Sequence, residues 1–192
     1  MANSARRGEP LTPGEIYETA LRLVDAGGVE ALSMRKLATE LGVNPMSLYH
    51  HVDDKTALIR EVARLAVSRL QLPADDGSPW QEQLRVLAGA YRVYAMRHPA
   101  LMSYIDAHPA VIQADSGMMA VLSRILRAAG VPERDLGHTA EVLIWFVSAL
   151  VTAEGGGMLG MRTGAVDADR SFEIAVELIV DGLAQGGAFK RP

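Results

Sequence analysis

The chain has no cysteine among its 192 residues. This absence excludes disulfide scaffolds, thiol catalysis and cysteine-ligated metal centres, and it favours a reducing compartment such as the cytoplasm. The sequence also lacks an excess of positive charge, because 19 Lys and Arg stand against 23 Asp and Glu. Bulk charge therefore does not predict DNA binding, and any affinity for nucleic acid must come from where the cations lie.

Long apolar runs are also missing. The longest strongly apolar run, residues 143–153, is shorter than the roughly 20 residues that cross a bilayer. The polar first ten residues show no apolar core of a secretion signal. We therefore expect a cytoplasmic protein with no membrane partner. Hydrophobic residues make up 49% of the chain, which suffices for one domain of ordinary size or a small domain fused to a larger one.

Apolar residues recur with a helical period and show no convincing alternation with period two, which predicts an all-α fold. Thr12, Pro13 and Glu15 form a capping box that starts the first helix, and Gly27 and Gly28 end it. Further helices are expected at residues 34–41, 45–52, 55–72, 80–98, 109–129, 132–154 and 170–185. A polar break at residues 73–79 separates two parts. Residues 1–71 are neutral, and the remainder carries the net charge of −4.

Residues 33–49 fit a helix-turn-helix motif. Ala38 is small where two short helices must cross, and Gly42 tolerates the positive φ of a short turn. The spacing directs one set of side chains inward, namely Leu37, Leu41, Val43, Leu48 and Val52. It leaves another set outward, free to enter a major groove, namely Met46, Ser47, Tyr49 and His50. The alternative is an ordinary helical hairpin within an all-α core.

The sequence here resembles the TetR family of transcriptional regulators. The resemblance rests on residues 31–38 (ALSMRKLA), 41–43 (LGV) and 47–52 (SLYHHV), followed by Asp54 and Lys55. Residues 97–99 (RHP) and 172–183 (FEIAVELIVDGL) look like the C-terminal domain of tetracycline repressors.

The resemblance implies a homodimeric, all-helical repressor that binds a palindromic operator in double-stranded DNA and releases it when a small, largely apolar effector binds. The implied parts are a helix-turn-helix DNA-binding domain at residues 1–56, a connecting helix at 57–72, and a ligand-binding and dimerisation domain at 80–192. A different class of function stays open: an all-α small-molecule binding protein that has lost specific DNA binding. Pro45 and the neutral N-terminal part are the features that favour it.

The resemblance also implies which residues contact DNA. Arg35 falls at a guanine-contact position, and an arginine can grip guanine with two hydrogen bonds. Other residues fall at phosphate-contact positions: Ser33, Met34, Ser47 and Lys55. Tyr49 and His50 fall at contact positions of the recognition helix. Pro45 and Met46 depart from tetracycline repressors, which carry an amide and a proline there, so the operator is expected to differ. Arg6 and Arg7 either form an arm along the DNA or have no fixed place.

The same resemblance places an effector pocket within residues 80–154. The residues expected to line it are Tyr91, Tyr94, Met102, Met118, Met119, Leu122 and Trp145. Methionine gives an adaptable surface that suits apolar ligands. Tetracycline repressors hold a drug–magnesium chelate with a histidine where this chain has Gln71, so that ligand is not expected.

The helix at residues 132–154 is apolar nearly all round, so it must be covered on two sides. The resemblance implies a four-helix bundle between two copies, built from this helix and the last one; the alternative is a monomeric core. The interface residues follow from the spacing of four and three: Leu143, Val147, Leu150, Phe172, Val176, Ile179 and Leu183.

Two letter patterns carry no chemistry. His50 and His51 are adjacent on an expected helix, so they point about 100° apart and serve one metal ion poorly. The glycines at 155, 157 and 160 have a dinucleotide-binding spacing but follow a helix rather than a strand. No Ser-His-Asp arrangement has the setting of a nucleophile elbow. We therefore expect no enzyme activity, no cofactor and no metal.

Overall fold

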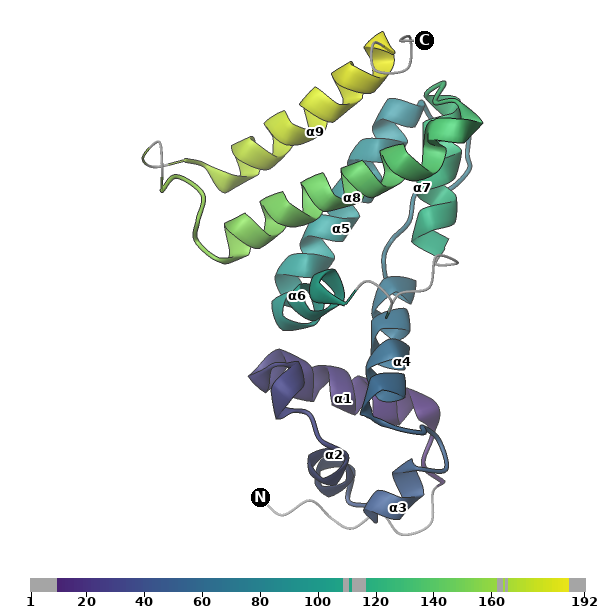
Figure 1. The fold of residues 1–192 in the computed structure, drawn as a ribbon, viewed down its shortest axis with the longest axis vertical. Coiled ribbons are helices and arrows are strands. Elements are labelled where there is room, and N and C mark those ends of the chain that lie inside the picture. Colours follow the sequence, from purple (N-terminus) through teal and green to yellow (C-terminus); the bar gives the residue numbers. More distant parts are fainter. Residues whose placement is uncertain (1–9, 109–110, 112–116, 162–163, 165, 187–192) are drawn as a thin grey trace. The chain divides into compact units, whose positions relative to one another are not determined.

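The structure, a computed structural model, describes residues 10–108, 111, 117–161, 164 and 166–186. In these ranges all regular structure is helical, as the hydrophobic periodicity predicts, and no strand occurs (Figure 1). The chain forms two compact units. The first comprises Met1–Arg69 and His98–Gln113, and the second comprises Leu70–Arg97 and Ala114–Pro192. Arg6 and Arg7 lie outside the described residues.

The first unit is built around α1. Its elements are α1 (Pro13–Gly27), the 3-10 turn η1 (Val29–Ala31), α2 (Met34–Leu41), α3 (Pro45–Leu48), α4 (Lys55–Ser68) and α6 (Pro99–Ala107). Helices α2, α4 and α6 all pack on α1. The contact face of α1 comes from its apolar stripe, because Ile16, Ala20 and Val24 have no accessible surface.

The capping box at the start of α1 is confirmed. The Thr12 hydroxyl accepts a hydrogen bond from the Glu15 amide at 3.3 Å, and the Glu15 carboxylate accepts one from the Thr12 amide at 3.1 Å. These two bonds satisfy amide groups that a helix N-terminus otherwise leaves without partners. The beginning of α1 is therefore fixed by two residues that lie three positions apart in the sequence.

Two helices are shorter than expected. α3 ends at Leu48 rather than at residue 52, because the Leu48 carbonyl accepts hydrogen bonds from the amides of His51 and Val52 and closes a turn. α4 ends at Ser68 rather than at residue 72. Pro73 disfavours helical geometry at the residue before it, and the Ser68 hydroxyl bonds back to the Leu65 carbonyl at 2.7 Å.

The place of α6 differs from the expected division of the chain. Residues 80–192 were expected to form one domain, yet α6 packs on α1 and η1 in the first unit. His98 precedes α6 and is 8% exposed, and its Nδ1 lies 2.9 Å from both carboxylate oxygens of Asp25 on α1. This contact joins residues 73 positions apart, so no local pattern announces it.

The second unit contains α5 (Trp80–Arg97), α7 (Gly117–Ala128), α8 (Glu133–Gly155) and α9 (Ala168–Gln185). α5 packs against the other three helices, and α8 packs against α7 and α9. Of the helix expected at residues 109–129, the structure shows Gly117–Ala128, and residues 109–110 and 112–116 lie outside the described residues. Of the glycine-rich connection expected at residues 155–169, residues 162–163 and 165 also lie outside them.

A half-buried arginine, Arg92, connects three helices of the second unit. The Arg92 guanidinium on α5 donates to both oxygens of Glu154 at 2.8 and 2.5 Å and to Asp169 at 2.7 Å. It also lies 4.8 Å from the centre of the Phe172 ring. The hydrogen bonds with Glu154 raise the pKa of Arg92, while burial lowers it. Glu154 lies in the last turn of α8, and Asp169 lies in the first turn of α9. The network therefore ties one end of each of these helices to α5.

Candidate nucleic-acid interface and ligand pocket

The turn between α2 and α3 has the geometry that its residues predict. Ser33 caps α2, its hydroxyl accepting a hydrogen bond from the Lys36 amide at 3.2 Å. Gly42 ends α2 in the left-handed region with φ of 68°, where a side chain would be strained. Asn44 then caps α3 by accepting from the Met46 amide at 2.9 Å. Two caps and one glycine therefore fix the relative directions of these short helices.

The inner face of this motif is buried as expected. Leu37 and Leu48 have no accessible surface, Ala38 is 1% exposed and Val52 is 5% exposed. Leu41 and Val43 are half-buried. Because one face of α3 is held inward, its opposite face is presented to solvent.

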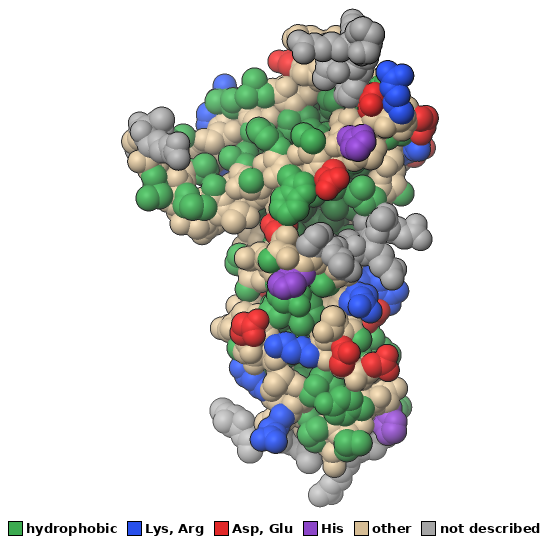
Figure 2. Space-filling model, viewed as in Figure 1, with side chains coloured by type: hydrophobic (Ala, Val, Ile, Leu, Met, Phe, Trp, Pro, Cys, Tyr) green, Lys and Arg blue, Asp and Glu red, His purple; other side chains and the backbone are tan. Residues whose placement is uncertain are grey.

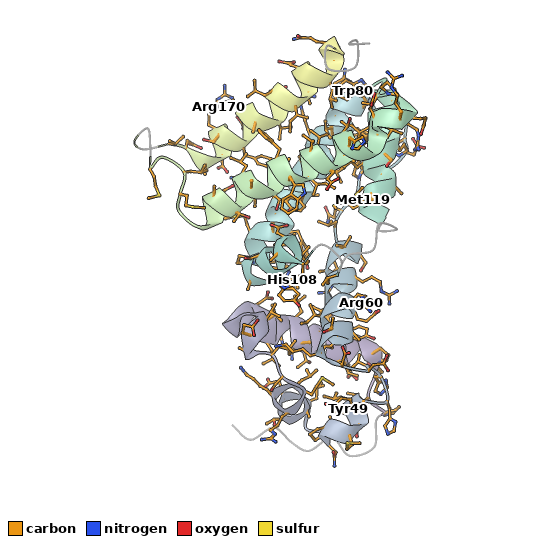
Figure 3. The ribbon with its side chains drawn as sticks, viewed as in Figure 1. Tyr49, Arg60, Trp80, His108, Met119 and Arg170 are labelled. Atoms are coloured by element: carbon orange, nitrogen blue, oxygen red, sulfur yellow. The ribbon has the colours of Figure 1, made fainter. Side chains whose placement is uncertain are left out.

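The residues expected to contact DNA fall into two groups. Arg35, Pro45, Met46, Tyr49 and His50 are exposed, together with Ser33. Three others are half-buried: Met34, Ser47 and Lys55. Figure 3 labels Tyr49 beside α3 at the same end of the first unit as α2. The structure therefore brings the expected residues of α2, α3 and the start of α4 together on the first unit.

An apolar pocket lies in the second unit, among α5, α7, α8 and α9. It holds about 540 Å³ of empty space, part of which is open to solvent. Its lining residues are Leu84, Leu87, Ala88, Tyr91, Met118, Leu122, Leu143, Ile144, Val147, Val176 and Ile179. The lining carries one hydroxyl, that of Tyr91, and no carboxylate, amine, guanidinium or imidazole. Such a surface offers a ligand dispersion and apolar burial rather than charge.

Three of the seven residues expected to line a pocket do so, namely Tyr91, Met118 and Leu122. Trp145 is 47% exposed and faces away from the pocket lining, and Tyr94 is buried elsewhere in the second unit. Met102 belongs to the first unit, where it is 9% exposed on α6. Met119, labelled on α7 in Figure 3, does not line the pocket, although its neighbour Met118 does. Adjacent positions of α7 thus differ in whether their side chains line the pocket.

Burial within the chain bears on the expected dimer positions, whose role stays a prediction. Phe172, Val176 and Leu183 are at most 8% exposed within the single chain, so they have little surface left for a partner. Three others, Leu143, Val147 and Ile179, line the pocket together with Val176. Leu150 is half-buried. Since α8 is apolar almost all round, a spacing of four and three fits its inner face as well as its outer one.

The large apolar side chains that α8 and α9 expose are not the expected ones. They are Val142, Trp145 and Phe146 on α8 and Ile174 and Leu178 on α9, all between 46% and 65% exposed. We call this set the α8/α9 face. Figure 2 shows hydrophobic side chains gathered on the exposed surface of the second unit. The sequence shows that α8 is apolar on more than one side, but it does not show which of these sides stays exposed.

A second arginine ties the linker after α4 to the pocket helices. Arg124 on α7 donates to Asp75 at 2.9 Å, to the Gln83 side-chain oxygen at 2.7 Å and to the Pro73 carbonyl at 3.0 Å. Gln83 on α5 in turn donates to the Ser78 carbonyl at 2.7 Å. Both α5 and α7 line the pocket, so the linker is held by the same helices that would contact a ligand.

The described residues contain no group of three or more His, Asp or Glu that could hold a metal ion. His50 and His51 are both exposed at the end of α3. The chemistry that the two sites offer is therefore recognition: cationic and apolar contacts on the first unit, and apolar enclosure in the second.

Comparison with known proteins gives matches to both units. Residues 16–62 match the family described as bacterial regulatory proteins, tetR family, and residues 84–179 match the tetracyclin repressor-like C-terminal domain. The HTH-type transcriptional repressor DrrR1 of Streptomyces coeruleorubidus is 32% identical over 76% of this chain and 50% of its own length. An HTH-type transcriptional regulator of Saccharopolyspora erythraea is 27% identical over 75% of this chain and 61% of its own length. The chain thus spans half to three-fifths of these two curated relatives.

Solved structures are similar over nearly the whole chain. ActR, a TetR family protein of Streptomyces coelicolor solved with (S)-DNPA, superposes with a TM-score of 0.80 at 26% identity, covering 93% of this chain and all of that one. ActR has also been solved with actinorhodin. BioQ of Mycobacterium smegmatis superposes with a TM-score of 0.76 at 28% identity, covering 91% of this chain and 99% of that one. BioQ has also been solved with its double-stranded DNA operator.

Proposed function

Because the chain belongs to the TetR family, we propose that it is a ligand-responsive transcriptional repressor. It binds a palindromic operator as a homodimer in the cytoplasm, and a small, largely apolar effector releases it. The observation that carries the proposal is the presence in one chain of an outward-facing α2–α3 surface and an apolar pocket. Neither feature alone separates a repressor from a simple binding protein.

On the first unit, the proposal assigns base contact to Arg35 and phosphate contact to Ser33, Ser47 and Lys55. The Ser33 hydroxyl accepts from the Lys36 amide, which leaves its own hydrogen for a phosphate oxygen. Arg35 is exposed, so its guanidinium is accessible to a guanine edge. The operator-bound structure of BioQ supports this assignment by family likeness.

A homodimer is supported by the α8/α9 face. α8 has a stretch of mean hydropathy 1.5, of which only 22% is buried within the chain, so by length and composition it could also cross a membrane. A second protein copy fits the face better than lipid, because the exposed Glu141 adjoins Val142 in the middle of the helix. We propose that the same face of a second chain covers Trp145, Phe146 and Leu178 and so pairs two DNA-contact surfaces.

An apolar effector is supported by the pocket lining. The side chains that line the pocket are almost entirely aliphatic or aromatic, which is the lining that suits an apolar organic ligand. ActR has been solved with actinorhodin and with (S)-DNPA, which supports a ligand in a pocket of this family but not its identity here.

Coupling of effector to operator is supported by the Arg124 contacts. An effector can change DNA affinity only if it binds two arrangements of the protein with different affinity. A ligand that separates α5 from α7 changes the spacing of Gln83 and Arg124. Arg124 holds Pro73 and Asp75 of the linker, and Gln83 holds its Ser78 carbonyl. That linker continues directly from α4, whose first residue is Lys55. Operator and effector are therefore expected to oppose each other reciprocally.

The deciding experiment is selection of bound duplexes from random DNA, followed by competition with a panel of uncharged aromatic compounds. The proposal expects enrichment of a palindrome and at least one compound that weakens its binding. A compound that binds while no palindrome is enriched would favour the other candidate, a small-molecule binding protein that has lost specific DNA binding. If a palindrome is enriched but no compound weakens binding to it, the protein binds an operator, and a response to uncharged aromatic effectors is refuted.

A further inference from the structure

Met46 presents an apolar side chain to solvent on the outer face of α3. With 67% of its surface accessible, it is the more exposed of the two large apolar residues on the described surface of the first unit; the other is Tyr49, at 47%. Tyr49 follows one helical turn later, and Pro45 immediately precedes Met46 and is also exposed. In Figure 2 hydrophobic side chains gather at the end of the first unit where Figure 1 shows α3. The surface that would meet a base edge is therefore mainly apolar.

The same face offers no guanidinium, side-chain amide or carboxylate. The nearest amide is Asn44, whose Oδ1 accepts from the Met46 amide at 2.9 Å and caps α3. A bidentate contact with adenine needs the amide oxygen and nitrogen to face the base together, whereas the Asn44 amide is oriented by its cap on α3. The polar groups that remain are the hydroxyls of Ser47 and Tyr49 and the imidazole of His50. Hydrogen-bond readout by α3 is correspondingly limited.

Among the base edges of the major groove, thymine alone carries an apolar group, its C5 methyl. Contact between a thioether side chain and that methyl removes apolar surface of both from water. Methionine is unbranched and adapts its side chain to an irregular surface. From this match we infer that Met46 is a specificity-determining residue that reads a thymine methyl group in each operator half-site. The inference rests on the proposed function, since it requires α3 to enter a major groove.

The expected effect is modest for each contact and larger for a pair. Burial of one methyl-sized group changes a binding constant by about fourfold. Loss of the methyl from both half-sites of a palindrome changes it by about 15-fold if the two contacts are independent. Arg35 lies on α2, so its guanine contact is a separate contribution.

The test uses the palindrome recovered from random DNA. Each thymine is replaced in turn, in both half-sites, by deoxyuridine, which keeps the base pair and removes only the methyl group. Fluorescence anisotropy at one fixed salt concentration then gives the dissociation constant. The wild-type protein is expected to lose about 15-fold at one symmetry-related pair of thymines. Met46→Ala is expected to bind the thymine and deoxyuridine duplexes equally, and Met46→Leu to keep most of the discrimination.

Met161→Ala is the matched control, because Met161 is a methionine of the second unit that is 78% exposed. It is expected to keep the full methyl sensitivity. Far-UV circular dichroism and thermal unfolding should be unchanged in all three variants, since both methionines are exposed.

Three results overturn the inference while the proposed function stands. They are a selected palindrome with no methyl-sensitive thymine, full methyl sensitivity in Met46→Ala, and an equal loss by Met46→Ala on random duplexes. Failure of the selection to enrich any sequence is a distinct result. It overturns the proposed function itself and the inference with it.

Discussion

The two units differ in where they leave apolar side chains exposed. Among the described residues of the first unit, the exposed large apolar side chains are those of Met46 and Tyr49, both at α3. The second unit exposes many more, on α5, on the connection after α8 and above all on the α8/α9 face. Isolated exposed apolar residues need no explanation, but a contiguous face marks a surface that meets something else. The first unit is thus a finished fold with one small contact surface, whereas the second is expected to be complete only in an assembly.

The largest expected effect comes from charging the α8/α9 face. Trp145→Asp combined with Leu178→Asp places carboxylates where we propose two chains meet, so it should give monomers. Operator binding should weaken by about 100-fold or more, because each DNA-contact surface then binds without its linked partner. Light scattering and anisotropy measure the two effects.

Val93→Asp is the matched control, since Val93 on α5 is 62% exposed but lies outside the α8/α9 face. It should leave the assembly unchanged. A Trp145→Asp, Leu178→Asp variant that still forms dimers would show that the α8/α9 face is not the dimer interface.

The next largest expected effect is on the stability of the second unit, through the pair of Arg92 and Glu154. Arg92→Leu removes the partner of Glu154, which is 11% exposed at the end of α8. Leaving a buried carboxylate alone should lower the free energy of unfolding by about 3 kcal/mol in urea denaturation. Arg85→Leu breaks the exposed pair with Glu177 and should leave stability unchanged within error. If both variants lost the same free energy of unfolding, the lower exposure of the Arg92–Glu154 pair would not be what makes it stabilising.

Arg35→Ala examines the other surface. It should cost about 1–3 kcal/mol at the selected operator and relax the preference at one guanine of each half-site. Lys55→Ala should instead weaken all duplexes alike and flatten the dependence of binding on salt. If Arg35→Ala lowered binding to random DNA as much as to the operator, Arg35 would be a backbone contact and not a base contact.

The smallest expected effects compare one glycine from each unit. Gly42→Ala places a side chain at φ of 68°, which should destabilise the protein by about 1 kcal/mol. Gly89→Ala lies within α5, where an added Cβ meets no atom within 4 Å, and should stabilise it by about 0.5–1 kcal/mol. Thermal unfolding measures both, and a stabilising Gly42→Ala would show that the turn does not need a glycine.

Local features of the fold were predictable because their causes lie within a few residues. The Thr12–Glu15 capping box, the Ser33 cap and the positive φ of Gly42 each follow from side chains that act on their own turn. Helical spacing predicts later ends for α3 and α4 than the structure shows. Pro73 and Ser68 are the local signals that indicate the earlier end of α4. The outward residues of α2 and α3 followed from the inner stripe, since a helix with one buried side exposes the other.

The sequence pattern does not distinguish the side of α8 that lines the pocket from the side that is exposed. Leu143 and Val147 recur with the spacing of an interface, and so do Val142, Trp145 and Phe146 on another side of the same helix. When both sides of a helix are apolar, periodicity fixes the pitch but not which side meets the chain's own core. Only the packing of α5, α7 and α9 on α8 assigned the first stripe to the pocket.

The sequence by itself determined the all-α class, the helix-turn-helix motif and the family, because these depend on local caps, small residues and short-range spacing. The tertiary structure decided that α6 belongs with the first unit, that Arg92 and Arg124 each join separate segments, and which apolar stripe stays exposed. Each of these depends on contacts between residues far apart in the chain. Such contacts are selected by the total burial and charge pairing of the folded protein, which no local window of the sequence contains.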